Sequence, residues 1–155
     1  MSDRQRSIEF RWDPTAEDGV GAVEVRVDGQ PFQALVGRAE TSSAKADGQP
    51  NLAGAYAGLR AWNFDPAAGH TLERHFLGDF ARNGKTTVLG CTCGEAGCWP
   101  LLARITVGDT EVIRDDFAQP HRRHWNHDQL GPFHIDRARY LASLRAAEDA
   151  ISRRD

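Results

Sequence analysis

The 155-residue sequence has no long apolar segment. No window of about 18 residues is uniformly apolar, which argues against a transmembrane helix. The first twelve residues, MSDRQRSIEFRW, also lack the apolar stretch of a secretory signal. We therefore expect a cytoplasmic chain with no membrane partner.

Cysteine is scarce, and neither positive nor negative charge predominates in the sequence. The three cysteines all fall between positions 91 and 98. An odd number of cysteines in a reducing compartment argues against a disulfide framework and favours thiol or metal chemistry. The 19 basic and 22 acidic residues leave a formal charge of −3, with no basic half of the kind that binds nucleic acid. We therefore expect no nucleic-acid partner.

Length and composition predict one globular unit. The chain is close to the commonest domain size, and its 40% hydrophobic content is enough for a core without metals or disulfides. We expect a single domain over residues 1–155, with frayed ends at 1–6 and 152–155.

Hydrophobic periodicity predicts an α+β fold, with hairpins forming one antiparallel sheet. Alternation in the first half indicates a strand at 7–12 and a hairpin of 23–27 with 31–36 around the Asp28-Gly29 turn, followed by a loop at 38–50. In the second half it indicates a strand at 87–89 and a hairpin of 101–107 with 110–117. Short helices are expected in the middle of the chain, the best defined being 71–80 with Thr71 as its cap. A terminal helix over 136–151, capped by Asp136, should pack on the sheet.

The strand registers also predict which side chains are buried and which are exposed. Residues expected in the core are Val23, Val25, Val27, Leu101, Ala103, Ile105 and Val107. Residues expected at the surface are Glu24, Arg26 and Arg104.

The most distinctive segment is the glycine-rich cysteine loop 90–100, GCTCGEAGCWP. Cys91, Cys93 and Cys98 are soft ligands at a C-x-C-x4-C spacing, and thiolates of this kind suit zinc. The spacing differs from that of zinc ribbons, so a fourth ligand has to come from elsewhere. Two other interpretations stay open: the cysteines are small buried apolar side chains at a strand end, or they are redox-active or nucleophilic thiols.

A second segment, 120–128, combines histidine, arginine and tryptophan. Its histidines recur every third residue, and His121 and His124 are candidates for the fourth metal ligand. Trp99, Arg122 and Trp125 are candidate binding residues at the same place. The alternative is a solvated basic and aromatic loop. The cysteine loop precedes strand 101–107, and the histidine loop follows strand 110–117. Antiparallel pairing brings the start of the first strand beside the end of the second, so we expect the two loops to lie side by side.

Two enzymatic motifs are excluded by their context. The segment 83–87, NGKTT, resembles the end of a nucleotide-binding P-loop, but five residues separate Gly78 from Gly84 where the motif has four, and a strand is expected after it. We therefore expect no nucleotide cofactor. No nucleophile elbow or H-E-x-x-H pattern occurs either.

Four segments resemble a family of uncharacterised bacterial proteins with a C-x-C-G-x-x-G-C-W-P cysteine loop. They are residues 51–59, 89–101, 119–122 and 130–133. The resemblance implies a bacterial, cytoplasmic, single-domain protein, and it implies no activity or catalytic residue.

The sequence leaves two classes of function. The favoured one is a non-enzymatic protein that binds another protein or a small ligand, with a structural zinc at the cysteine loop. The alternative is an enzyme that uses a cysteine thiolate or a metal held by cysteine and histidine.

Overall fold

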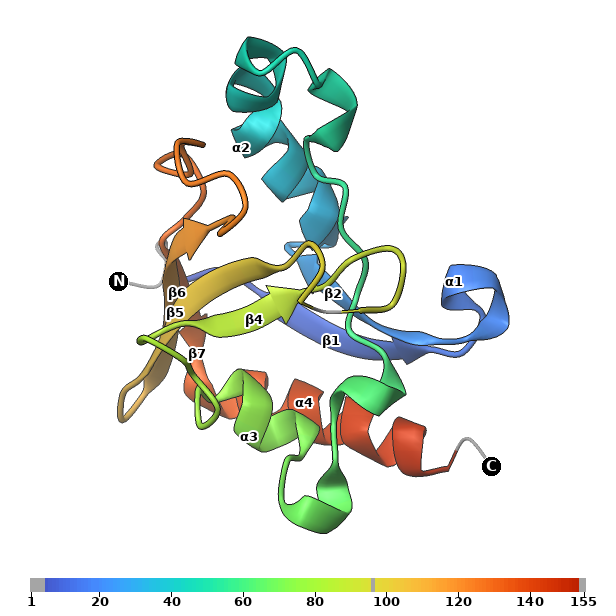
Figure 1. Cartoon of the computed structure of the whole chain (residues 1–155). Helices are drawn as coiled ribbons and strands as arrows, with labels where there is room; N and C mark the ends of the chain where they lie inside the picture. The colour runs from blue at the N-terminus through green and yellow to red at the C-terminus, as the bar shows by residue number, and fades with distance from the viewer. Residues whose placement is uncertain (1–4, 96, 154–155) are drawn as a thin grey trace.

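Two antiparallel sheets and four helices make up the structure (Figure 1), a computed structural model that describes residues 5–95 and 97–153. One sheet has the order β1-β2-β3, with bounds Ile8–Asp13, Ala22–Val27 and Gln30–Pro31. The other has the order β4-β5-β6-β7, with bounds Thr86–Leu89, Leu101–Val107, Glu111–Ala118 and Phe133–Asp136. The helices are α1 (Ala16–Gly19), α2 (Phe32–Ala46), α3 (Leu72–Phe76) and α4 (Arg137–Ser152), with 3-10 turns η2 (Pro50–Leu52), η3 (Ala61–Asn63) and η4 (Pro66–Ala68). The α+β class is confirmed, with two sheets where one was expected.

The terminal helix α4 closes the core, as its apolar spacing predicts. The Asp136 carboxylate caps it by accepting a hydrogen bond from the Arg139 backbone N–H at 3.0 Å. Helix α4 packs on β1 of one sheet and on β6 and β7 of the other. Tyr140 and Leu144 are fully buried in this interface, and the Tyr140 hydroxyl donates to the Phe76 carbonyl. One cluster of apolar side chains therefore joins the two sheets.

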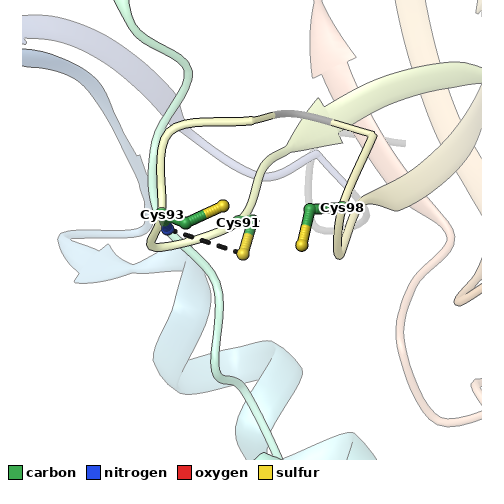
Figure 2. Close-up of side chains that lie close together, drawn as sticks. All are labelled: Cys91, Cys93 and Cys98. Carbon is green, nitrogen blue, oxygen red and sulfur yellow. Dashed lines mark hydrogen bonds between the residues drawn. The ribbon is translucent and has the colours of Figure 1, made fainter.

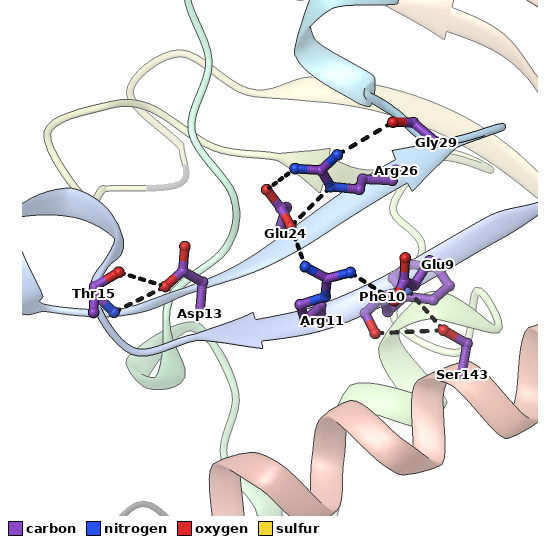
Figure 3. A network of polar contacts seen from close by, with 9 residues as sticks. All are labelled: Glu9, Phe10, Arg11, Asp13, Thr15, Glu24, Arg26, Gly29 and Ser143. Carbon is purple, nitrogen blue, oxygen red and sulfur yellow. Dashed lines mark hydrogen bonds and ion pairs between the residues drawn. The ribbon is translucent and has the colours of Figure 1, made fainter.

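Charged side chains cover the outer face of β1 and β2 (Figure 3). Arg26 donates two hydrogen bonds to the Glu24 carboxylate, and Arg11 lies between Glu9 and Glu24. On the opposite side, the Phe10 backbone N–H donates to the Ser143 hydroxyl at 2.7 Å and ties β1 to α4. The alternation of charged and apolar residues thus sets which face of this sheet meets the core.

The predicted strand at 31–36 and the predicted loop at 38–50 are wrong. The strand stops after Gln30–Pro31, and α2 then runs from Phe32 to Ala46. The buried residues of α2 lie four apart, at Phe32, Val36, Glu40 and Ala44, which is one face of a helix. Packing of that face overrides the strand preference of its first residues.

The burial predictions hold near the core and fail at the hairpin tip. Val23, Val25, Val27, Leu101 and Ala103 are buried and Arg104 is exposed, as predicted. Ile105 is half-buried and Val107 is 38% exposed, because this end of β5 extends beyond the elements that cover it. Glu24 and Arg26 are half-buried, not exposed, since each shields the other.

The middle of the chain forms short helices, as expected. Thr71 caps α3 by accepting a hydrogen bond from the Arg74 N–H at 3.1 Å, but the helix ends at Phe76 and not at Phe80. Among the described residues, none of the helices has the length and apolarity needed to cross a membrane.

The expectation of frayed ends falls mostly on residues 1–4 and 154–155, which lie outside the described residues. Arg6 is held in place: its backbone N–H donates to the His134 carbonyl at 2.7 Å, and its guanidinium pairs with Asp28.

Candidate metal centre

The segment 57–60 positions the cysteine loop against the rest of the protein. Ala57 and Gly90 exchange two backbone hydrogen bonds of 2.9 and 2.8 Å just after β4. On the other side of the same segment, the Val23 N–H donates to the Leu59 carbonyl. The segment therefore links β2 to the start of the loop that runs from β4 to β5.

Two side chains of the next residues hold the loop in shape. The buried Arg60 donates to the Thr92 carbonyl at 3.0 Å, and the Trp62 indole donates to the Gly94 carbonyl at 3.2 Å. Gly94 has a φ of +97°, and a Cβ there would collide with the Arg60 guanidinium. Glycine at this position lets the loop close over Arg60.

Within this loop the three cysteines converge on one point (Figure 2). The Sγ atoms of Cys91, Cys93 and Cys98 all lie within 4.8 Å of one another. All three are free thiols; Cys93 and Cys98 are exposed and Cys91 is half-buried. This exposure argues against the interpretation that they are merely buried apolar side chains. The sulfurs form a three-ligand group that could hold a metal ion.

The thiols differ in how readily they lose a proton. Burial acts to raise the pKa of Cys91, but hydrogen bonds from the Cys93 backbone N–H and from neighbouring side chains outweigh burial and lower that pKa. Hydrogen bonding to Cys91 and Cys93, together with their negative charge, raises the pKa of Cys98 to about 11. Cys91 therefore loses its proton more readily than Cys98.

The predicted proximity of the two loops is confirmed. Nε2 of His121 lies 3.3 Å from the Gly97 carbonyl oxygen, and its ring stacks on Trp99 with a 6.2 Å separation of centroids. The convergent ligand group nevertheless contains no histidine among the residues that the structure describes. His124 instead has its Nε2 2.9 Å from both carboxylate oxygens of Asp47. Metal ligation by His121 or His124 stays a prediction.

The three predicted binding residues pack together beside the cysteine loop. The Arg122 guanidinium lies 5.2 Å from the centre of the Trp99 ring, and Trp99 meets Trp125 edge to face. The Trp125 indole donates to Asp47 at 2.7 Å. Trp125 is buried and Trp99 is half-buried, so this cluster anchors the 119–128 loop at the C-terminal end of α2.

A buried polar network behind this cluster was missed from the sequence. Glu40 is fully buried and accepts hydrogen bonds from the Gly54 N–H at 2.9 Å and the Tyr56 hydroxyl at 2.7 Å. Its Oε2 also lies 2.7 Å from Nε2 of His127. The Gln119 amide donates to the Tyr56 oxygen at 3.2 Å and closes the network. The signal in the sequence was an acid in register with the apolar face of 32–44, which the predicted strand at 31–36 and the predicted loop at 38–50 concealed.

The segment that resembles a P-loop is a tight turn. Asn83 and Gly84 both have positive φ, and Arg82 pairs with Lys85 across them. Strand β4 begins at Thr86, where a phosphate-binding loop would lead into a helix.

Comparison of the chain with protein-family models, with curated proteins and with solved structures finds no match. Of the resemblance noted from the sequence, the structure shows the cysteine loop, as three cysteines close together.

Proposed function

We propose that this is a cytoplasmic metal-binding protein that holds a zinc ion through Cys91, Cys93 and Cys98. The observation that carries the proposal is the convergence of three sulfurs on a loop fixed from outside by Arg60 and Trp62. Holding three thiols close together costs conformational entropy, and the thiolates repel one another. Binding of a soft divalent ion to the sulfurs offsets both costs.

In the favoured form of the proposal the protein is not an enzyme, and the metal stiffens the loop as a binding surface. The exposed Trp62 indole, 61% accessible, borders the loop through its hydrogen bond to Gly94. An exposed tryptophan beside a rigid loop is the kind of side chain that anchors protein partners. The fourth ligand would come from water, from His121 or from the partner.

One observation favours the enzymatic alternative. Three ligands converge in the described part of the chain, and Cys93 and Cys98 face solvent. A zinc with three protein ligands and an open position is typical of catalytic sites, where the bound water is activated.

The test starts from reduced, metal-free protein titrated with zinc by calorimetry and with cobalt by absorption spectroscopy. We expect one equivalent to bind, with sulfur-to-cobalt charge-transfer bands. The matched control moves one thiol: Cys93→Ser combined with Ser42→Cys keeps three cysteines but places one on the exposed surface of α2. Affinity should fall by at least about tenfold in this variant and should be unchanged by Ser42→Cys alone.

Absence of stoichiometric binding, or equal affinity of the relocated-thiol variant, would refute the metal site. To separate the two forms of the proposal, zinc-loaded and metal-free protein are compared for hydrolysis of an activated ester. A zinc-dependent rate that disappears in Cys91→Ser supports the enzyme, and equal rates support the binding protein.

A further inference from the structure

A groove of about 880 Å³ lies along the 119–132 loop, and none of the three cysteines lines it. Its walls come from the 82–85 turn, the end of β6 and the 119–132 loop. The volume is within the range of small-molecule sites. The groove is therefore a separate place at which the chain can receive a ligand.

The side chain that marks the groove as a site is His127. Its side chain is 4% exposed and lines the groove, and its Nε2 is held by the fully buried Glu40. No hydrogen bond of Nδ1, on the other edge of the ring, is found among the described residues. A carboxylate that fixes one ring nitrogen orients the other, as behind catalytic and metal-bound histidines. The groove is thus lined by an imidazole whose orientation is fixed by Glu40.

The charges around His127 indicate the class of ligand. Lys85 pairs with Asp116 at 3.4 Å, and Arg122 lies 3.8 Å from Asp47. Arg82 and Arg123 also line the groove, are exposed, and have no ion pair in the described part of the chain.

Asp115 is likewise neutralised by Arg104, so Asp128 is the one groove carboxylate without an ion pair within residues 5–95 and 97–153. Two unpaired guanidinium groups against one carboxylate leave the groove locally positive in a chain whose formal charge is −3. The guanidinium fork matches the geometry of carboxylate and phosphate groups.

We propose that this groove binds a small ligand bearing an oxyanion, a phosphate or a carboxylate, through Arg82, Arg123 and the Nδ1 edge of His127. The guanidinium groups neutralise the anion and donate to its oxygens. Because the Nε2–H of His127 is directed at Glu40, Nδ1 accepts a hydrogen bond from a protonated ligand oxygen when the ring is neutral and donates one when the ring is protonated. The site is independent of the metal centre.

The experiment titrates the full-length protein at low salt with inorganic phosphate and, separately, with malonate, using calorimetry. We expect saturable binding of at least one anion. Arg123→Gln and Arg82→Gln should each weaken that binding about tenfold, the usual effect of losing one charge-assisted hydrogen bond. Arg153→Gln, which removes an exposed arginine at the end of α4, is the matched control and should change it by less than about twofold.

His127→Asn should also weaken binding, and if it disturbs folding the two arginine variants decide the matter alone, because both side chains are exposed. Binding of phosphate alone assigns a phosphate group, and binding of malonate alone assigns a carboxylate. Lack of saturable binding by either anion, or equal affinity in Arg123→Gln and the control, would overturn the proposal. Retained binding in Cys93→Ser keeps the test separate from that of the metal site.

Discussion

Removal of the Glu40 carboxylate should destabilise the protein through the docking of its 119–128 loop. Glu40 is fully buried on α2 and accepts hydrogen bonds from a backbone amide, from Tyr56 and from His127. Glu40→Ala leaves these buried donors without their acceptor. Glu40→Gln keeps the shape and one acceptor oxygen while removing the charge.

The magnitude follows from the cost of unpaired buried groups. One unsatisfied buried donor costs about 1–3 kcal/mol, and breaking a buried charged pair costs about 3–5 kcal/mol. We therefore expect Glu40→Ala to lower the free energy of unfolding by about 3–5 kcal/mol. For Glu40→Gln we expect a loss of about 1–2 kcal/mol, because the tyrosine hydroxyl and the histidine ring can turn or change tautomer to accept from the new amide.

Urea unfolding followed by tryptophan fluorescence measures this effect, since Trp125 lies in the docked loop and is buried. Ser42→Ala, at an exposed position of the same helix, is the control and should change stability by less than about 0.5 kcal/mol. The reasoning is refuted if Glu40→Ala costs no more than the control, or if Glu40→Gln costs as much as Glu40→Ala.

Three further predictions concern other parts of the molecule. Burial lowers the pKa of His75 from 6.5 to about 4, so between these pH values the unfolded chain binds a proton that the folded chain does not. The free energy of unfolding should therefore fall by about 3 kcal/mol as the pH drops from 6.5 to 4. Urea midpoints measured over this range should decline less steeply in His75→Gln. Arg114 is fully buried and its guanidinium lies over the rings of Phe10 and Phe76, with Nε and Nη2 unpartnered among the described residues. Arg114→Met should therefore raise the unfolding free energy by about 1–3 kcal/mol, and a loss in denaturation experiments would show that the guanidinium has a partner. Gly94→Ala should weaken zinc binding in calorimetric titrations, because φ is positive there and the added Cβ collides with the Arg60 guanidinium. Gly97→Ala is the control and should leave zinc binding unchanged, because the space around Gly97 is open. Equal effects of the two substitutions would contradict the role assigned to the loop shape.

Much of the second half of the fold could be predicted from local pattern, although strand β7 at Phe133–Asp136 was missed. Strand β5 and helix α4 have regular periods with clear turn or capping residues at their ends, and both form where expected. Helix α2 could not be predicted in this way, because its first residues also suit a strand and its buried face includes Glu40. A buried acid looks like a surface residue until its hydrogen-bond donors, which are distant in sequence, are known.

For the candidate site, the sequence by itself determined the chemistry available. Three cysteines within eight positions, separated by glycines, bring soft ligands into one loop regardless of the rest of the fold. The position of the histidine loop beside the cysteine loop could also be predicted, because β5 and β6 form an antiparallel hairpin and the two loops are attached to the same end of it. Only the tertiary structure decided which side chains meet. It orients His127 toward Glu40 of α2 and His124 toward Asp47 just after that helix. The buried Glu40 carboxylate is removed from water and needs hydrogen-bond donors, one of which His127 supplies.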